Sequence, residues 1–171
     1  MKKLEENIFL IGFMGAGKST VAAELERQLH IPRAEMDALI VEREGMVISD
    51  IFAEKGETYF RDAETALLKD LTEKKGIIIS CGGGAVMRDE NAALMKQCGK
   101  IVLLTATPET IYERVKDSTD RPILNGNMNV DYIRELMEKR KDRYLAVADV
   151  IVATDQKSAE EITREILAAF A

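Results

Sequence analysis

The sequence predicts an α/β fold in which helices cover both faces of a parallel β-sheet. Apolar runs rich in β-branched residues are continuous, as expected of strands buried on both faces, and cover residues 7–11, 76–81, 100–104 and 149–153. Stretches with helical periodicity lie between and after them, at about residues 18–30, 57–74, 89–98, 108–117, 131–145 and 158–170. Strands that alternate with helices form crossover units, which place parallel strands in one sheet.

The first apolar run leads directly into a phosphate-binding pattern. Residues 12–19 read GFMGAGKS, which matches GxxxxGK[ST], and an amphipathic helix follows. The glycines let backbone N–H groups point at phosphate oxygens, Lys18 reaches the β- and γ-phosphates, and the Ser19 hydroxyl can bind Mg²⁺. The helix N-terminus adds partial positive charge beneath the phosphates. The pattern therefore predicts nucleotide binding. Phe13 and Met14 fill spacer positions, for which the pattern requires no particular side chain.

Residues 33–56 interrupt the regular alternation of strands and helices. A short strand is predicted over residues 33–37, followed by a helical segment punctuated by Gly45 and Gly56. Asp37 ends this predicted strand, so we expect it at the carboxyl edge of the sheet, where ligands bind in such folds.

A second glycine cluster, at residues 82–84, follows the strand predicted at residues 76–81. Consecutive glycines let a ligand approach the backbone closely. An anionic acceptor with hydroxyl groups needs arginines for its carboxylate and an acidic group for the reacting hydroxyl. Arg61, at the start of a helix, and Arg140, late in the helix of residues 131–145, join Asp37 as candidates for these tasks.

Residues 117–130 are polar, lack periodicity and contain Pro122 and Gly126. A loop of this length inside a compact domain is usually functional, and we predict that it forms a lid over bound substrates. A plain connection between two helices is the alternative.

Composition excludes several classes of protein. An apolar content of 46% allows a buried core, which a disordered chain lacks. The net charge of −6, without a basic tract, argues against a nucleic-acid partner. No apolar run approaches the roughly 20 residues that cross a bilayer, and residues 1–6 lack the apolar stretch expected of a signal peptide. We expect a cytoplasmic monomer without membrane contact.

Cysteine and histidine usage narrows the chemistry. Two cysteines, Cys81 and Cys98, are too few for a disulfide framework and suit a reducing compartment. Cys81 is expected to be a small buried residue. A single histidine, His30, and the absence of a CxxC pair argue against structural zinc, and His30 is predicted to lie at a helix end.

A nucleotide-binding loop occurs in GTPases, motor ATPases and small-molecule kinases. The chain has no Asn-Lys-x-Asp segment to read guanine, and 171 residues are few for a motor. The remaining class is a kinase that transfers a γ-phosphoryl group to a small acceptor under a closing lid.

The motifs together resemble the shikimate kinase family. The resemblance extends over about residues 7–155 and rests on residues 7–20, 45–64, 80–86, 121–124 and 148–149, in the family's order and spacing. The phosphate loop combined with GETYFRDAE at residues 56–64 and the three-glycine turn is specific, whereas the phosphate loop alone is not.

This resemblance implies one domain over residues 1–171, with the P-loop fold of nucleoside-monophosphate kinases. In that fold a five-stranded parallel sheet lies between two helical layers. The resemblance also implies an acceptor-binding segment at about residues 33–64 and the lid at about residues 117–130.

The implied reaction is the phosphorylation of the 3-hydroxyl of shikimate by ATP and Mg²⁺, in the chorismate and aromatic amino-acid pathway. The resemblance implies catalytic roles for Lys18, Asp37 and Arg121, with Asp37 activating the hydroxyl. ATP would contact Gly15, Ala16, Gly17, Lys18, Ser19, Thr20, Arg114, Arg121 and Lys157. The acceptor would contact Asp37, Arg61, Gly82, Gly83, Gly84 and Arg140, beside Phe52 and Phe60. Mg²⁺ would be held by Ser19 and Glu35.

Two departures from the family pattern leave alternatives open. The family's Asp-x-Asp reads Glu35-Met36-Asp37 here, and the added methylene leaves open whether Glu35 reaches the metal. The family's Arg-x-Pro-x-Tyr reads RKDRY at residues 140–144, so Arg143 competes with Arg140 for the acceptor carboxylate.

Two other functions also remain open. A kinase for another small hydroxy acid, such as gluconate, would keep the phosphate loop and lid without arginines converging on a ring carboxylate. A non-catalytic ATP-binding regulator would bind ATP without acceptor-dependent release of ADP.

Overall fold

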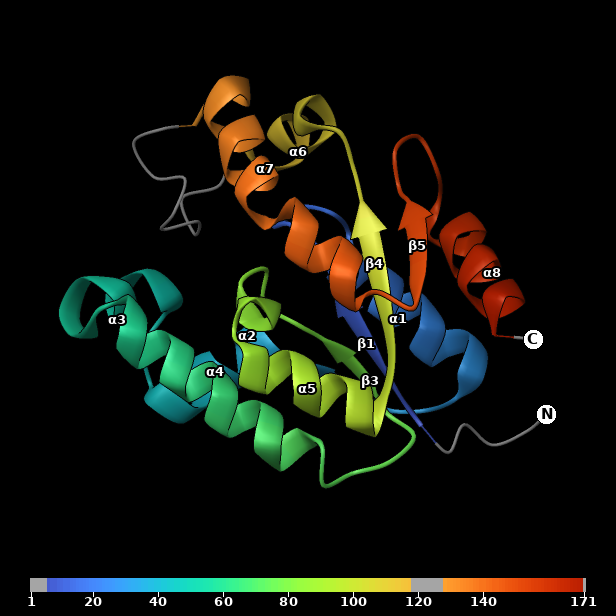
Figure 1. The fold of residues 1–171 in the computed structure, drawn as a ribbon, viewed down its shortest axis with the longest axis horizontal. Helices are drawn as coiled ribbons and strands as arrows, with labels where there is room; N and C mark the ends of the chain where they lie inside the picture. Colours follow the sequence, from blue (N-terminus) through green and yellow to red (C-terminus); the bar gives the residue numbers. More distant parts are fainter. Residues whose placement is uncertain (1–5, 118–127, 171) are drawn as a thin grey trace.

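A five-stranded parallel sheet forms the centre of the protein (Figure 1). The structure, a computed structural model, describes residues 6–117 and 128–170. The strand order within these residues is β2-β3-β1-β4-β5. The strands are β1 (Asn7–Ile11), β2 (Arg33–Glu35), β3 (Ile78–Ser80), β4 (Gly99–Thr105) and β5 (Val150–Ala153). The predicted α/β fold and the five-stranded parallel sheet are therefore confirmed.

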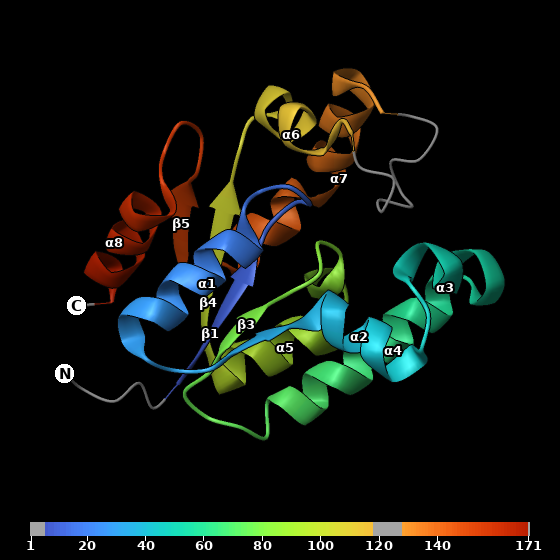
Figure 2. The same ribbon diagram turned by 180° about the vertical axis from the view of Figure 1, so that it is seen from behind.

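Helices cover both faces of the sheet. They are α1 (Lys18–Leu29), α2 (Met36–Glu44), α3 (Ile48–Lys55), α4 (Glu57–Leu71), α5 (Asp89–Cys98), α6 (Pro108–Val115), α7 (Val130–Val147) and α8 (Ala159–Ala169). A 3₁₀ turn spans Ala85–Met87. Figures 1 and 2 show α1 and α8 on one face and α4 and α5 on the other. The helix ends predicted at Gly45, Gly56 and His30 are the C-caps of α2, α3 and α1.

The core lies on both sides of β1, which explains why residues 8–11 of this strand are continuously apolar. Phe9 and Ile11 pack in one hydrophobic cluster with residues of α4 and α5. Ile8 and Leu10 pack in the other cluster, with residues of α1 and α8. Because successive side chains of a strand point to opposite faces, a strand covered on both faces keeps no polar alternation.

The prediction that Asp37 ends the second strand is wrong. β2 stops at Glu35, which pairs with Ser80, the last residue of β3. The neighbouring strand offers no pairing partner beyond that point, because the chain turns away at the glycine cluster. Asp37 therefore lies in the first turn of α2. It stays at the carboxyl edge of the sheet, as expected.

The segment predicted to be a lid lies almost entirely outside the described residues. Residues 118–127, and Arg121 among them, connect α6 to α7. Across the described part of the chain, no helix is both long enough and apolar enough to cross a membrane.

Asn7 joins the start of β1 to the loop that enters β3. Its side chain is buried, its Nδ2 donates to the Lys74 carbonyl (3.0 Å), and its Oδ1 accepts from the Ile77 N–H (3.1 Å). The loop is thereby held in the register that places β3 beside β1.

Asn7→Leu is expected to lower the free energy of unfolding by about 2–4 kcal/mol, because it leaves main-chain groups of Lys74 and Ile77 without partners and each costs roughly 1–3 kcal/mol. Urea denaturation measures the change. Lys74→Ala is the matched control, since Lys74 accepts through its main-chain carbonyl and its side chain is exposed. Equal stability of Asn7→Leu and the control would contradict this role.

Candidate active site

A cavity of about 560 Å³ lies at the carboxyl edge of the sheet, a size suited to small-molecule ligands. Segments far apart in the sequence line it: Met14, Gly15, Gly17, Lys18, Ser19, Thr20, Glu35, Asp37, Ala38, Ser80, Cys81, Gly83 and Arg114. The structure thus brings together most of the residues predicted to bind nucleotide and the carboxylate predicted to activate the acceptor.

The loop between β1 and α1 has the backbone that phosphate binding requires. Gly17, with φ +101°, is the N-cap of α1 and adopts a conformation that side chains disfavour. Among the described residues, no side chain caps the N-terminus of α1. Its first N–H groups therefore remain available for an anion. Ala16 is buried inside the loop and contributes through its backbone.

Ser19 and Glu35 form an oxygen pair beside Lys18. The Ser19 hydroxyl donates to Glu35 Oε2 at 2.9 Å, and Lys18 Nζ donates to the Gly12 carbonyl at 2.6 Å. A hydroxyl and a carboxylate are ligands that Mg²⁺ prefers. No cluster of three or more metal-binding side chains occurs among the described residues. This donor set fits Mg²⁺, which is bound through one or two side chains together with substrate phosphates.

Arg114 lines the cavity beside the phosphate loop. Its Nη1 donates to the Gly15 carbonyl (2.9 Å) and to Thr154 Oγ1 (3.1 Å), so α6 is tied both to the phosphate loop and to the end of β5. Lys157, also predicted to contact ATP, forms an ion pair with Glu165 of α8 at 2.9 Å.

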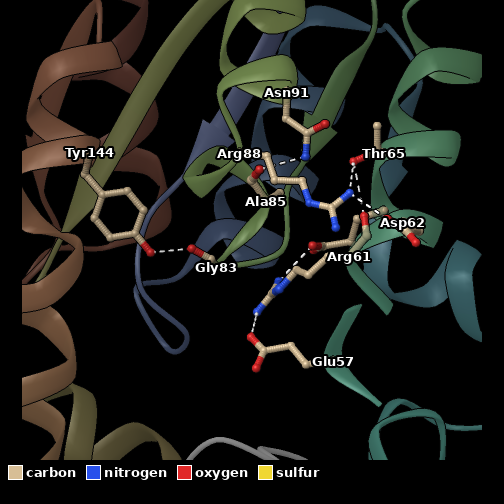
Figure 3. A network of polar contacts seen from close by, with 10 residues as sticks. Glu57, Arg61, Asp62, Thr65, Gly83, Ala85, Arg88, Asn91 and Tyr144 are labelled. Atoms are coloured by element: carbon tan, nitrogen blue, oxygen red, sulfur yellow. Dashed lines mark hydrogen bonds and ion pairs between the residues drawn. The ribbon is translucent and has the colours of Figure 1, made fainter. Parts of the chain in front are cut away.

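Arg61 forms an ion pair with a fully buried carboxylate. Its Nη1 lies 2.7 Å from Glu64 Oε1, and its Nη2 lies 3.5 Å from Glu57 Oε1 (Figure 3). Burial raises the pKa of Glu64, and the neighbouring Arg61 opposes that shift. The second carboxylate oxygen of Glu64 has no hydrogen-bond partner among the described residues. Arg61 therefore places a positive charge beside the cavity, and it also neutralises the negative charge of Glu64.

The glycine turn packs directly on this ion pair. A Cβ at Gly84 would lie 2.6 Å from the Arg61 guanidinium, and one at Gly82 would lie 2.5 Å from Glu64 Oε2 and 3.1 Å from Asp37 Oδ1. A side chain at Gly82 or Gly84 would therefore displace these charged groups from their present positions. Asp37, Arg61 and the glycine turn are thus brought together, as predicted.

Two aromatic rings lie beside Arg61. Phe60 of α4 and Phe52 of α3 have ring centroids 4.9 Å apart, and the Arg61 guanidinium carbon lies 5.2 Å from the Phe60 centroid. The rings join α3 to α4 at the predicted acceptor segment.

Arg140 and Arg143 have different surroundings. Arg140 Nη1 lies 3.1 Å from the position of a Cβ at Gly83, is buried, and has no hydrogen-bond partner in the described chain. Arg143 forms an ion pair with the exposed Asp89. Of the two arginines left open by the sequence, only Arg140 lies against the glycine turn.

Glu64, Phe13 and Tyr144 are site residues that sequence reasoning assigned no role. The Tyr144 hydroxyl donates to the Gly83 carbonyl (Figure 3), and burial raises the pKa of Tyr144, so the phenol keeps its proton. The Arg140 guanidinium carbon lies 5.6 Å from the Phe13 ring centroid. Helical spacing could have found Glu64, three residues after Arg61, and Tyr144, four after Arg140. Nothing in the sequence indicated Phe13.

Cys81 lines the cavity but is chemically protected. Burial raises the pKa of its thiol to about 12, so the nucleophilic thiolate is scarce at pH 8. The predicted buried role is confirmed.

Iodoacetamide at pH 8 is expected to leave Cys81 unmodified in the folded protein and to modify it in denaturant, as read by peptide mass spectrometry. The half-buried Cys98 is the internal comparison. Equal modification of Cys81 in both states would contradict its protection.

Comparisons with known proteins agree with this geometry. The family model for shikimate kinase matches residues 14–171. A shikimate kinase of Dehalococcoides mccartyi (strain ATCC BAA-2266 / KCTC 15142 / 195) is 43% identical, covering 96% of this chain and 93% of the relative. A shikimate kinase of Aquifex aeolicus is 44% identical, covering 94% and 93%.

Solved structures give the same result. The shikimate kinase from Acinetobacter baumannii in complex with shikimate has a TM-score of 0.94 at 33% identity, covering 98% of this chain and 94% of that one. A gluconokinase from Sinorhizobium meliloti 1021, with a TM-score of 0.64, 20% identity and coverage of 98% and 93%, shares the fold alone. With its phosphate loop, its glycine turn and relatives above 40% identity along nearly its whole length, this chain belongs to the shikimate kinase family.

Proposed function

We propose that this protein transfers the γ-phosphoryl group of ATP to the 3-hydroxyl of shikimate, giving shikimate 3-phosphate and ADP. The observation that carries the proposal is the buried Arg140 Nη1, which has no partner in the described chain and lies against the turn that borders the phosphate-loop cavity. A buried guanidinium nitrogen without a hydrogen-bond partner costs free energy, which a ligand carboxylate would offset. Membership of the shikimate kinase family supports shikimate as that ligand.

In this proposal the phosphate loop holds ATP. Backbone N–H groups from Gly15 to Thr20 surround the phosphates, and Lys18 neutralises charge on them. Ser19 and Glu35 would hold Mg²⁺, which supplies further neutralisation of the phosphate oxygens when bound. Arg114 holds the phosphate loop from the side of β5 and borders the nucleotide.

The acceptor lies between Asp37 and the two arginines. The oxygen of the 3-hydroxyl attacks the γ-phosphorus while Asp37 accepts the hydroxyl proton. The bond between that phosphorus and the ADP oxygen breaks. Arg140 and Arg61 bind the shikimate carboxylate, with Gly83 alongside. Because Glu64 already balances Arg61, Arg140 contributes most of the positive charge that the acceptor meets.

Several sequence-based expectations stay predictions. They are the contact of Lys157 with ATP, the action of Arg121 from a lid at about residues 117–130, a single domain, and a cytoplasmic monomer without nucleic-acid or membrane contact.

ADP release from MgATP with shikimate, quinate, gluconate or no acceptor tests the proposal. Release with shikimate alone is expected, because two guanidinium groups near one turn suit a single ring carboxylate. Release with gluconate alone would reassign the acceptor. ATP binding without release for any acceptor would indicate a regulator.

Arg140→Gln is expected to raise the KM for shikimate by about 10- to 100-fold, because hydrogen bonds to charged groups contribute roughly 1.5–3 kcal/mol each. The KM for ATP should change little. The variant breaks no ion pair within the described chain, unlike Arg61→Ala, which would leave Glu64 buried and unpaired.

Arg143→Gln is the matched control for this measurement. It lies on the same helix and removes the same charge, but it pairs with exposed Asp89. A rise in the shikimate KM for Arg143→Gln, with none for Arg140→Gln, would reverse the assignment.

A further inference from the structure

The phosphate loop contacts Arg140 through a side chain that the nucleotide-binding pattern leaves unspecified. Phe13 follows the first glycine of the loop, and its ring centroid lies 5.6 Å from the Arg140 guanidinium carbon. The ring is almost fully buried, at 3% exposure, in the hydrophobic cluster that includes Leu104 and Ile111. A fixed aromatic face therefore lies against the guanidinium of a residue 127 positions away in the chain.

Among the described residues, Arg140 lacks the acidic partners that Arg61 has, and the Tyr144 hydroxyl is a polar group that interacts with its guanidinium. Arg61 is held by Glu64 and Glu57 through its own helix. Arg140 Nη1 has no hydrogen-bond partner in the described chain, although the atom is buried. An arginine side chain loses rotamer entropy when it is fixed, and this loss weakens ligand binding unless another contact orders the side chain beforehand.

We propose that Phe13 is a positioning residue that holds the Arg140 guanidinium at the glycine turn, ready for the carboxylate of the acceptor. Its ring attracts the cation and orders it without using any of its hydrogen-bond donors. Nη1 stays available for the ligand, whereas an acidic partner would compete for it. The inference rests on the proposed function and extends it, because it places a determinant of acceptor binding inside the nucleotide-binding loop.

The surroundings of Gly83 show how close Arg140 lies to the phosphate loop. A Cβ at Gly83 would lie 3.1 Å from Arg140 Nη1, 3.4 Å from the Met14 nitrogen and 3.5 Å from the Gly12 oxygen. The phosphate loop, the glycine turn and Arg140 therefore meet at one point. The loop that carries Phe13 fixes the ring relative to the turn that borders the acceptor.

The test distinguishes two roles of Phe13: attraction of the Arg140 guanidinium by its aromatic face, and packing in the hydrophobic core. Phe13→Leu keeps an apolar side chain and removes the face, and Phe13→Tyr keeps the face. Phe13 and Tyr144 line a cavity of about 250 Å³ beside the ring. Steady-state kinetics of the wild type, both variants, Arg140→Gln and Phe13→Leu/Arg140→Gln form a double-mutant cycle.

Phe13→Leu is expected to lower kcat/KM for shikimate roughly tenfold through KM, the size expected of a desolvated cation–π contact. The KM for ATP should change less than twofold, and Phe13→Tyr should retain wild-type values. In the Arg140→Gln background, Phe13→Leu should have no further effect. An equal loss in both backgrounds, or an equal rise in the KM for ATP, would overturn the proposal.

A second measurement does not depend on the acceptor. In NMR spectra of the free protein, the Arg140 Nε–H signal should carry a ring-current shift and slow side-chain motion that Phe13→Leu removes. If wild-type protein releases no ADP with shikimate, the proposed function fails and this signal still decides the role of Phe13. An Arg140 signal that is identical in wild type and Phe13→Leu would disprove it.

Discussion

The parallel pairing of β1 with β3 is the constraint on which the site depends. The pairing ends with Leu10 beside Ser80, and the Cys81 N–H donates to the Leu10 carbonyl at 3.0 Å. Both strands lead into glycine-rich turns at the same edge of the sheet, where a Cβ at Gly83 would lie 3.5 Å from the Gly12 oxygen. A slip of one residue would move one turn by roughly 3.3 Å along the other and separate the phosphate loop from the acceptor turn.

Charge is distributed unequally between the two sides of the acceptor site. On α4, Arg61 is balanced by the buried Glu64, and such a pair gains little net stability because both charges are desolvated. On α7, Arg140 is supported by the Phe13 ring and keeps its charge uncompensated in the described chain. In the proposed function, the acceptor carboxylate would therefore meet one ordered ion pair and one cation that lacks an anion.

Local patterns predicted the fold and the nucleotide loop because strand burial, helix periodicity and the glycine spacing depend on neighbouring residues. Asp37 was placed on the wrong element because the end of β2 is set by the length of β3, a distant segment. Phe13 acquires its role only from Arg140, which follows it by 127 positions. The pairing of Lys157 with Glu165 likewise depends on how α8 packs. The choice between Arg140 and Arg143 depends on which face of α7 lies toward the glycine turn, and the sequence spacing does not give that orientation.

The site consists of a nucleotide part built by the sheet and an acceptor part built by helices that reach the same glycine turn. The ion pair of α4 packs on Gly82 and Gly84, and α7 holds Gly83 through the Tyr144 hydroxyl. Side chains of both helices pack against Gly82, Gly83 and Gly84. A side chain added to this turn would therefore displace charged groups of α4 or α7. A change of acceptor would therefore require α4 and α7 to change together, while the phosphate loop could stay as it is. This explains in physical terms why a shared fold alone does not identify the acceptor, and why the residues around the turn do.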